Sequence, residues 1–347
     1  TILKGTITSD VTLAAGNTYK LSGEYIVEEG ATLHIEEGVK IIAVYDDIAD
    51  YILVKQGGKI NAVGTPDKPI VMTSEKEEPG AWGGIHICGR AHTNAEGGKG
   101  SSEIGGAVYG GNDDADNSGT LQYIRLEYTG FAFDEEHEAN GISFYGVGNG
   151  TIVDHCQAYK GSDDGFEFFG GSVNVSNLVA VSCSDDSFDW TEGWNGKGTN
   201  LVAYQEAEST LGYDCDCLME CDNNGSNNAA TPVAHPVLKN LILVGNGGSK
   251  QGIRLRAGTE VEIDNAKVCG KGQPLTVETA LTENALKNGT SKLTNITLTS
   301  ELSCKEGIYT HADFIAVTSN KVDANLSYSS FEDIRKECSW MNGSWVK

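Results

Sequence analysis

The residues best suited to chemistry are acidic side chains that recur in two segments of similar sequence. Residues 161–169 read GSDDGFEFF and residues 183–191 read CSDDSFDWT, which is an offset of 22 positions. The matching acids are Asp163 with Asp185, Asp164 with Asp186, and Glu167 with Asp189. If the two segments lie on neighbouring strands, about 4.8 Å apart, their carboxylates crowd together. Like charges at such a spacing raise the pKa of one partner unless a cation or hydrogen bonds hold them.

Three interpretations of these acids are open. Calcium takes about six to eight oxygen ligands, and the candidate ligands are Asp163, Asp164, Asp185, Asp186, Asp189 and Asp222, with further acids in loops at residues 113–116, 134–138 and 214–223. Sugar hydrolysis instead needs a pair of carboxylates, and the catalytic candidates are then Asp163, Asp164, Asp185 and Asp186. In the third interpretation, these aspartates accept hydrogen bonds from backbone N–H groups at the corners of the chain.

Other side chains near these acids are candidates for binding a carbohydrate. Trp190 and Trp194 bracket a short loop after the second acidic segment. Together with Tyr128 they predict a flat surface on which a sugar stacks. Arg254 and Arg256 would bind an acidic or hydroxylated sugar. The alternative for Trp190 is packing in the core.

Both acidic segments belong to a longer internal repeat. Short apolar segments start near residues 140, 164, 186, 217, 251 and 273, and a second series starts near residues 121, 151, 173, 200, 237, 261 and 292. Gly, Asn and Asp, which tolerate left-handed backbone conformations, separate the segments. Stacked coils of roughly 22–34 residues are typical of a parallel β-helix. Residues 283–288 and 332–338 are the only short helix candidates.

The composition excludes several classes of protein. The 347 residues include 49 Asp and Glu against 25 Lys and Arg, so the net charge is −24. Such a field repels a phosphate backbone and excludes nucleic-acid binding, and no apolar run predicts a transmembrane segment. High acidity with few lysines is typical of an extracytoplasmic protein. The chain starts at Thr1 in strand-like sequence, which suggests a processed or trimmed chain.

Nine cysteines cannot all pair within one chain. Cys215, Cys217 and Cys221 resemble half of a zinc knuckle, but the second half is absent. We therefore expect one short-range disulfide there, or small side chains that face inward. Cys304 and Cys338 flank the last segment and predict a disulfide that pins it.

Several strings of the sequence resemble a known family. They are GGKI at 57–60, GTPDKPI at 64–70, WGGI at 82–85, YGGNDD at 109–114, RLEYTG at 125–130 and GIRLR at 252–256. Over about residues 20–265 the chain resembles the secreted or surface right-handed β-helix proteins of Bacteroidetes, in the pectin-lyase-like superfamily. The resemblance implies the fold, export and attachment to a bacterial outer membrane, and no particular reaction. Polygalacturonases of this superfamily use aspartates on neighbouring coils, but their Asn-Thr-Asp and His-Gly motifs are missing here.

We therefore expect an all-β, right-handed parallel β-helix with irregular terminal caps. Residues 1–300 would form the helix with an N-terminal strand cap, and residues 301–347 a C-terminal capping segment. The functional hypothesis is an exported or cell-surface protein, non-catalytic, that presents an acidic face to a carbohydrate or another surface partner, with structural Ca²⁺ and no organic cofactor. The alternative is a pectinase-like polysaccharide hydrolase or lyase that uses the stacked aspartates.

Overall fold

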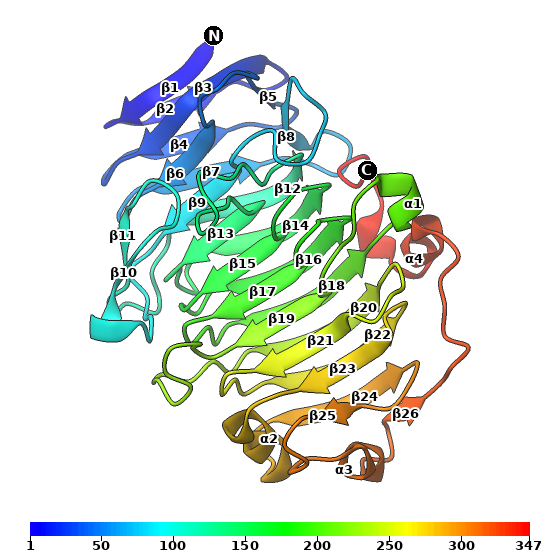
Figure 1. The fold of residues 1–347 in the computed structure, drawn as a ribbon. Coiled ribbons are helices and arrows are strands. Elements are labelled where there is room, and N and C mark those ends of the chain that lie inside the picture. The colour runs from blue at the N-terminus through cyan, green and yellow to red at the C-terminus, as the bar shows by residue number, and fades with distance from the viewer.

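The computed structural model describes residues 1–347 as a single stack of coils. Twenty-four strands pair in parallel, and β10 (Gly100–Ser101) and β11 (Val108–Tyr109) form a separate antiparallel pair. The parallel pairings form three rows, which we call faces 1, 2 and 3. Because successive coils up to residue 298 contribute a strand to each face, the predicted parallel β-helix is confirmed (Figure 1).

Face 1 consists of short strands. These are residues 5–7 of β1 (Ile2–Ile7), residues 24–27 of β3 (Thr18–Val27), β6 (Tyr51–Val54), β9 (Ile85–Cys88), β13 (Ile142–Tyr145), β15 (Phe166–Phe169), β17 (Phe188–Thr191), β19 (Met219–Asp222), β21 (Gln251–Arg256), β23 (Gln273–Val277) and β25 (Ser303–Cys304). The first apolar series of the sequence corresponds to β13 through β23, as predicted.

Faces 2 and 3 share long strands that bend at their middle. Face 2 contains β2 (Val11–Leu13), β4 (Thr32–Ile35), β7 (Lys59–Val63) and the first halves of β12 (Gly119–Glu127), β14 (Ile152–Tyr159), β16 (Asn174–Val181), β18 (Lys197–Tyr204), β20 (Val237–Val244), β22 (Glu262–Cys269) and β24 (Lys292–Leu298). Face 3 contains residues 2–3 of β1, residues 18–21 of β3, β5 (Lys40–Ala43), β8 (Ile70–Ser74), the second halves of the long strands and β26 (Lys321–Val322).

The core lies inside the coils and forms one cluster of 63 buried residues. Side chains alternate along each strand, so Phe166 and Phe168 of β15 point inward while Glu167 points out. The register pairs Phe166 with Phe188 and Glu167 with Asp189, which confirms the offset of 22 residues. Equivalent side chains of successive coils therefore stack. The ring centres of Phe144 and Phe168 lie 5.0 Å apart, and the two rings are nearly parallel.

An asparagine ladder forms the corner between faces 2 and 3. Its members all have a positive φ, and they are Asn177, Asn200, Asn240, Asn265 and Asn295. Asn tolerates this conformation, as the sequence indicated. The side-chain amides bond from coil to coil: Asn200 Nδ2 donates to Asn177 Oδ1 at 2.9 Å, and Asn265 Nδ2 donates to Asn240 Oδ1 at 2.8 Å. The ladder thus pairs side-chain amides on successive coils from Asn177 to Asn265, while Asn295 donates to Asp264.

Helices lie outside the coils. They are α1 (Glu208–Leu211), α2 (Ala280–Lys287), α3 (His311–Ala316) and α4 (Phe331–Glu337), with the short 3₁₀ turns η1 (Glu96–Gly98) and η2 (Ser339–Met341). Helices α2 and α4 confirm the two predicted helices, whereas α1 and α3 were not predicted. None of the helices has the length and apolar character needed to cross a membrane.

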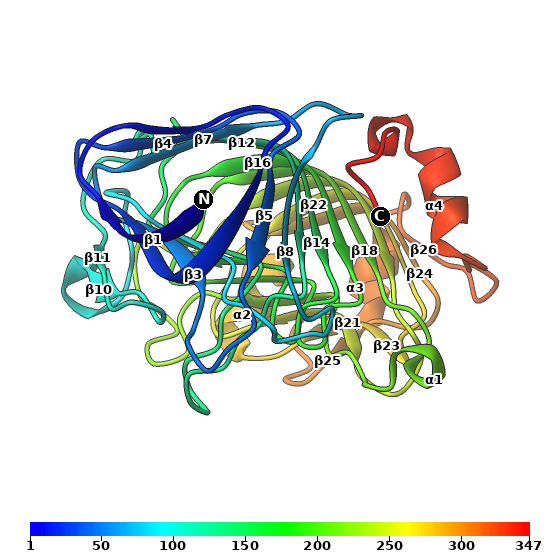
Figure 2. The ribbon, with the colours of Figure 1, turned by 90° about the horizontal axis from the view of Figure 1, so that it is seen from above.

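The C-terminal tail, residues 323–347, runs back along face 3 (Figures 1 and 2). Trp345 is fully buried, and its backbone N–H donates to Pro66 O at 3.2 Å. Gln157 bonds the backbone of Lys347 in both directions, at 2.8 and 3.2 Å. The last residues of the chain therefore contact coils whose residues come much earlier in the sequence.

All nine cysteines are free, so both disulfide predictions are wrong. Cys304 lies on the last strand of face 1, whereas Cys338 ends α4 beside face 3, so the two cannot meet. Cys221 points into the core from β19, while the Cys217 thiol lies 3.7 Å from Asp216 Oδ1. Cys215, Cys217 and Cys221 are buried, and Cys221 faces inward, which agrees with the other expectation for this cluster.

We predict that Trp345→Ala lowers the free energy of unfolding by about 3–5 kcal/mol, because it removes a fully buried indole. Tyr45→Ala, which removes a ring that is 54% exposed, serves as the control and should cost less than about 1 kcal/mol. Thermal and urea unfolding followed by circular dichroism measure both variants. Equal costs for the two variants would show that the tail is not docked on face 3.

Candidate functional site

A groove on face 1 is lined entirely by carboxylates. Its volume is about 300 Å³, and its nine lining residues are Glu103, Glu135, Glu136, Glu138, Asp163, Asp164, Glu167, Asp185 and Asp189. No basic, amide or apolar side chain lines it. A larger cavity of about 640 Å³ on face 2 has a mixed lining and no such concentration of charge. The groove is therefore the part of the surface with the clearest chemical character.

The floor of the groove comes from two successive coils. Asp163 and Asp164 precede β15, and Asp185 precedes β17 at the position equivalent to Asp163, one coil farther along the stack. Three overlapping groups each place one carboxylate oxygen per residue within 4.8 Å of the others: Asp163, Asp164 and Asp185; Asp164, Glu167 and Asp189; and Asp185, Asp186 and Asp216. The crowding of carboxylates expected from the repeat is thus present.

Two inserted loops form the walls. Glu103 comes from the turn between β10 and β11, and Glu135, Glu136 and Glu138 come from the loop between β12 and β13. The acidic loop at residues 134–138 was among the predicted oxygen donors. Glu103 was missed, because it lies in an insertion that repeats nothing else in the sequence. Only the fold shows that Glu103 belongs to the groove.

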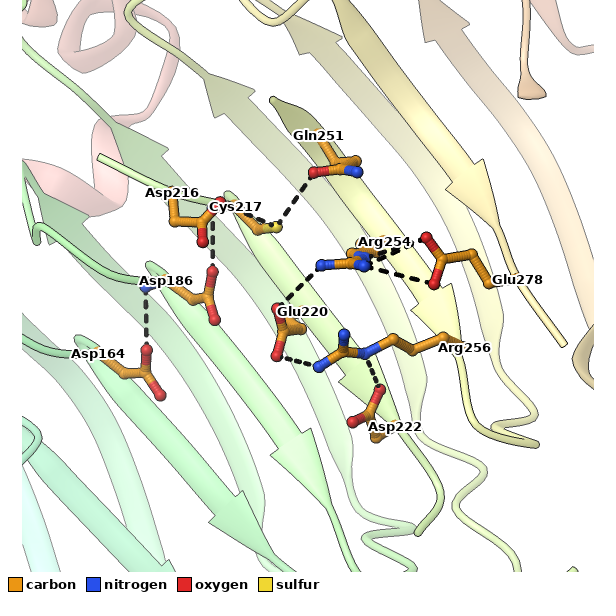
Figure 3. Close-up of polar contacts among 10 residues, drawn as sticks. All are labelled: Asp164, Asp186, Asp216, Cys217, Glu220, Asp222, Gln251, Arg254, Arg256 and Glu278. Atoms are coloured by element: carbon orange, nitrogen blue, oxygen red, sulfur yellow. Dashed lines mark hydrogen bonds and ion pairs between the residues drawn. The ribbon is translucent and has the colours of Figure 1, made fainter. Parts of the chain in front are cut away.

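Part of the acidic stack bonds to the backbone. Asp164 Oδ1 accepts a hydrogen bond from Asp186 N at 2.9 Å, and Asp186 Oδ1 accepts one from Cys217 N at 2.9 Å (Figure 3). Each aspartate caps an N–H group of the next coil, which is close to the third interpretation of the sequence. This role uses one oxygen of each residue and leaves the carboxylates of Asp163 and Asp189 without a backbone donor.

A buried amide stands beside the acids. Asn140, which is fully buried, occupies the position of Asp164 one coil earlier. Its Nδ2 donates to Glu167 Oε2 at 2.6 Å and to Ser143 Oγ at 2.9 Å. Its Oδ1 is also buried and has no hydrogen-bond partner in the protein. The match of NGISF with DGFEF in the sequence could have identified this oxygen as a candidate ligand.

Burial and mutual repulsion raise the pKa values of these acids. Burial is the larger cause, and the charges of Glu167 and Asp185 add to it, raising the pKa of Asp163 to about 10. The same causes, again burial first, raise the pKa values of Asp164 and Asp189 well above the ordinary range. Without a counter-charge, several of these carboxyls hold protons at neutral pH. A cation in the groove would supply that charge instead.

Carboxylates already surround the two predicted arginines. Arg256 Nε donates to Asp222 Oδ1 at 2.7 Å, and Arg256 Nη2 also bonds Glu220 (Figure 3). Arg254 pairs with Glu278 at 3.2 Å and lies 3.8 Å from Glu220. Asp222, a predicted metal ligand, is thus part of this ion-pair network and outside the carboxylate groups described above. This ion-pair network lies on the coils that follow the acidic groove along the stack.

The predicted aromatic platform is corrected by the structure. Trp190 and Trp194 are each 1% exposed and lie in the core, where Trp194 stacks on Phe168 at 4.1 Å. Because Asp189 points outward from β17, its neighbour Trp190 must point inward. Tyr128 is 7% exposed and lies under the Lys347 side chain, whose Nζ is 5.6 Å from the ring centre. None of the three can stack on a ligand in the groove.

We predict that the metal-free protein becomes less stable as pH rises. A carboxyl whose pKa is raised by folding stabilises the folded state below its unfolded pKa of about 4 and loses that contribution as pH rises through its folded pKa. For Asp163 this window runs from about 4 to about 10. In chelator, Asp163→Asn should therefore gain melting temperature over the wild type by an amount that grows from pH 5 to pH 8.

Asp67→Asn, at an exposed position, is the control for the loss of one charge. A constant difference between Asp163→Asn and the wild type across this pH range would contradict the crowding described here.

Comparison with known proteins assigns the chain to a family. Searches of curated proteins and of solved structures found no match. The sequence model of the pectate-lyase-like β-helix domain matches residues 5–346, which is nearly the whole chain. This match agrees with the stacked coils and with the three faces described above. The chain therefore belongs to the family of pectate-lyase-like β-helix domains.

Proposed function

We propose that this chain is an exported β-helix protein that binds calcium in the groove of face 1 and presents the ion to a carbohydrate or another cell-surface partner. The observation that carries the proposal is the groove itself, whose nine lining residues are all acidic. A bound cation would offset both the repulsion between these charges and the energetic cost of burying them. On this reading the groove acts by binding, without catalysing a reaction.

The geometry of the acids suits calcium. Calcium–oxygen distances are about 2.3–2.6 Å, so two oxygens on one ion lie at most about 5 Å apart. The groups around Asp164 hold their oxygens within 4.8 Å of one another. The unpartnered Asn140 Oδ1 adds an uncharged oxygen of the kind that calcium accepts. Magnesium, which requires a tighter octahedron and keeps its waters, fits such a wide set less well.

The open side of the groove supports a role in binding an outside ligand. Calcium has more coordination positions than one group of three acids fills, so hydroxyl or carboxylate oxygens of a glycan can complete the shell. Without the ion, the nine acids would repel an acidic glycan. The arginines that would otherwise attract such a glycan are held by Glu220, Asp222 and Glu278.

One observation favours the alternative, a polysaccharide hydrolase or lyase. Asp163, Asp164, Asp185 and Asp186 lie together, and burial raises the pKa of all four carboxyls, so that one of them can keep the proton that a general acid donates. A calcium ion would lower these pKa values and remove that feature. The two functions therefore differ in their response to calcium.

We predict that calcium stabilises the wild type and that chelator reverses the effect. At a calcium concentration 100 times the dissociation constant, the gain is about 2.7 kcal/mol per site. The double variant Asp163→Asn/Asp185→Asn should lose at least tenfold in affinity by isothermal titration calorimetry. Asp67→Asn/Glu301→Gln removes the same charge from two exposed positions and should bind as the wild type does. The proposal fails if elemental analysis finds no calcium and chelator leaves the melting temperature unchanged.

We predict that oligosaccharides of uronic acids bind only when calcium is present and are recovered intact. Binding is measured by calorimetry with and without calcium, and cleavage by chromatography of the same samples. Asp164→Asn keeps an oxygen for the Asp186 N–H group and removes the charge. Products that appear with the wild type and disappear with Asp164→Asn would establish the hydrolase or lyase instead.

A further inference from the structure

A second groove lies on the opposite side of the molecule, between the asparagine ladder and the C-terminal tail. Its volume is about 350 Å³, which is within the range of small-molecule sites. Asn200, Asn240 and Asn265 form one side, and Trp340 of the tail forms the other. It shares no residue with the acidic groove of face 1.

The ladder offers a row of unused hydrogen-bond donors. Each asparagine amide carries two N–H bonds, and the structure uses one: Asn200 Nδ2 donates to Asn177, Asn240 Nδ2 to Asn200, and Asn265 Nδ2 to Asn240. The second N–H of each amide is left for an outside partner. Because the amides sit on successive coils, these donors repeat at about 4.8 Å along the stack.

The rest of the groove is apolar and uncharged overall. Val202 and Ile242 of face 3 form its floor, and the half-buried Trp340 supplies an aromatic wall. The only charged residues are Lys267 and Glu337, which pair at 3.3 Å and cancel each other. A ligand here needs an apolar face for the indole and polar groups along its edge.

The protein fills the same corner with one of its own rings in earlier coils. There Tyr123 and His155 occupy the ladder position, and the Trp345 indole packs edge-on against them at 5.9 and 5.3 Å. Farther along, Asn200, Asn240 and Asn265 share the groove with Trp340 of the tail. The corner is thus suited to a flat ring, and in these coils the ladder lines the groove where Trp345 packs in the earlier ones.

We propose that this groove binds a neutral oligosaccharide. A pyranose ring has an apolar face of C–H bonds that stacks on an indole and a rim of hydroxyls that accept from amide N–H groups. The absence of net charge in the groove, within a chain of net charge −24, separates this ligand class from acidic glycans. No ion takes part, so binding here is independent of calcium and of the function proposed for face 1.

The test measures binding of neutral gluco-, xylo- and manno-oligosaccharides by calorimetry and tryptophan fluorescence, in chelator. We expect at least one series to bind, with Trp340→Ala and Asn265→Gly each weakening the affinity at least tenfold. Asn295→Gly is the matched control, because Asn295 has the same positive φ and donates one side-chain hydrogen bond to the preceding coil, to Asp264 Oδ1 at 2.7 Å, but lies outside the groove. Glycine tolerates this conformation, so both variants should fold.

Three results would overturn the proposal: no neutral series binds, Asn265→Gly and Trp340→Ala bind as the wild type does, or binding requires calcium. The variant Asp163→Asn/Asp185→Asn separates the two sites. It should weaken calcium binding at least tenfold and leave neutral-oligosaccharide binding within twofold of the wild type. Failure at one groove is therefore distinguishable from failure at the other.

Discussion

Each strand of face 1 bonds to its neighbours in parallel and in register, so a residue type that recurs along the sequence recurs as a column on the surface. In the core this is favourable, because Phe166 stacks on Phe188 and Phe144 on Phe168. At the corner between faces 2 and 3 it is favourable again, because an amide both donates and accepts. For carboxylates the same register brings like charges together in a place where burial already disfavours them.

The two grooves show opposite solutions to this constraint. From Asn177 to Asn265 the ladder amides donate to and accept from one another and carry no charge, while the aspartate stack satisfies only the oxygens that cap the next coil. On the C-terminal side, Arg254 and Arg256 neutralise the acidic column from within the chain. Between the two loops no arginine or lysine lines the groove, and there the chain depends on protons or on an ion from solution.

The sequence predicted the coils well, because the repeat at 161–169 and 183–191 is also the register of β15 and β17. It predicted the clustering of Asp163, Asp164 and Asp185 for the same reason. It could not place Glu103, since an insertion between coils has no counterpart in the repeat. For Trp190 the sequence left both a stacking surface and core packing open, and the outward direction of Asp189 beside it decides for the core. The disulfide predictions failed because Cys304 and Cys338 lie on different faces, and because Cys221 points into the core while the Cys217 thiol lies beside Asp216.

The tail has a mechanical consequence. In a solenoid each coil contacts mainly its neighbours, so unravelling can begin at an end and proceed one coil at a time. Here Arg125 bonds the carbonyl of Ser344, and Lys347 reaches Glu127, so the end of the chain is fastened near its middle. The last coils cannot peel away until Trp345 leaves its pocket. This strap makes coils about 200 residues apart in sequence resist a pulling force together, as a closed loop does.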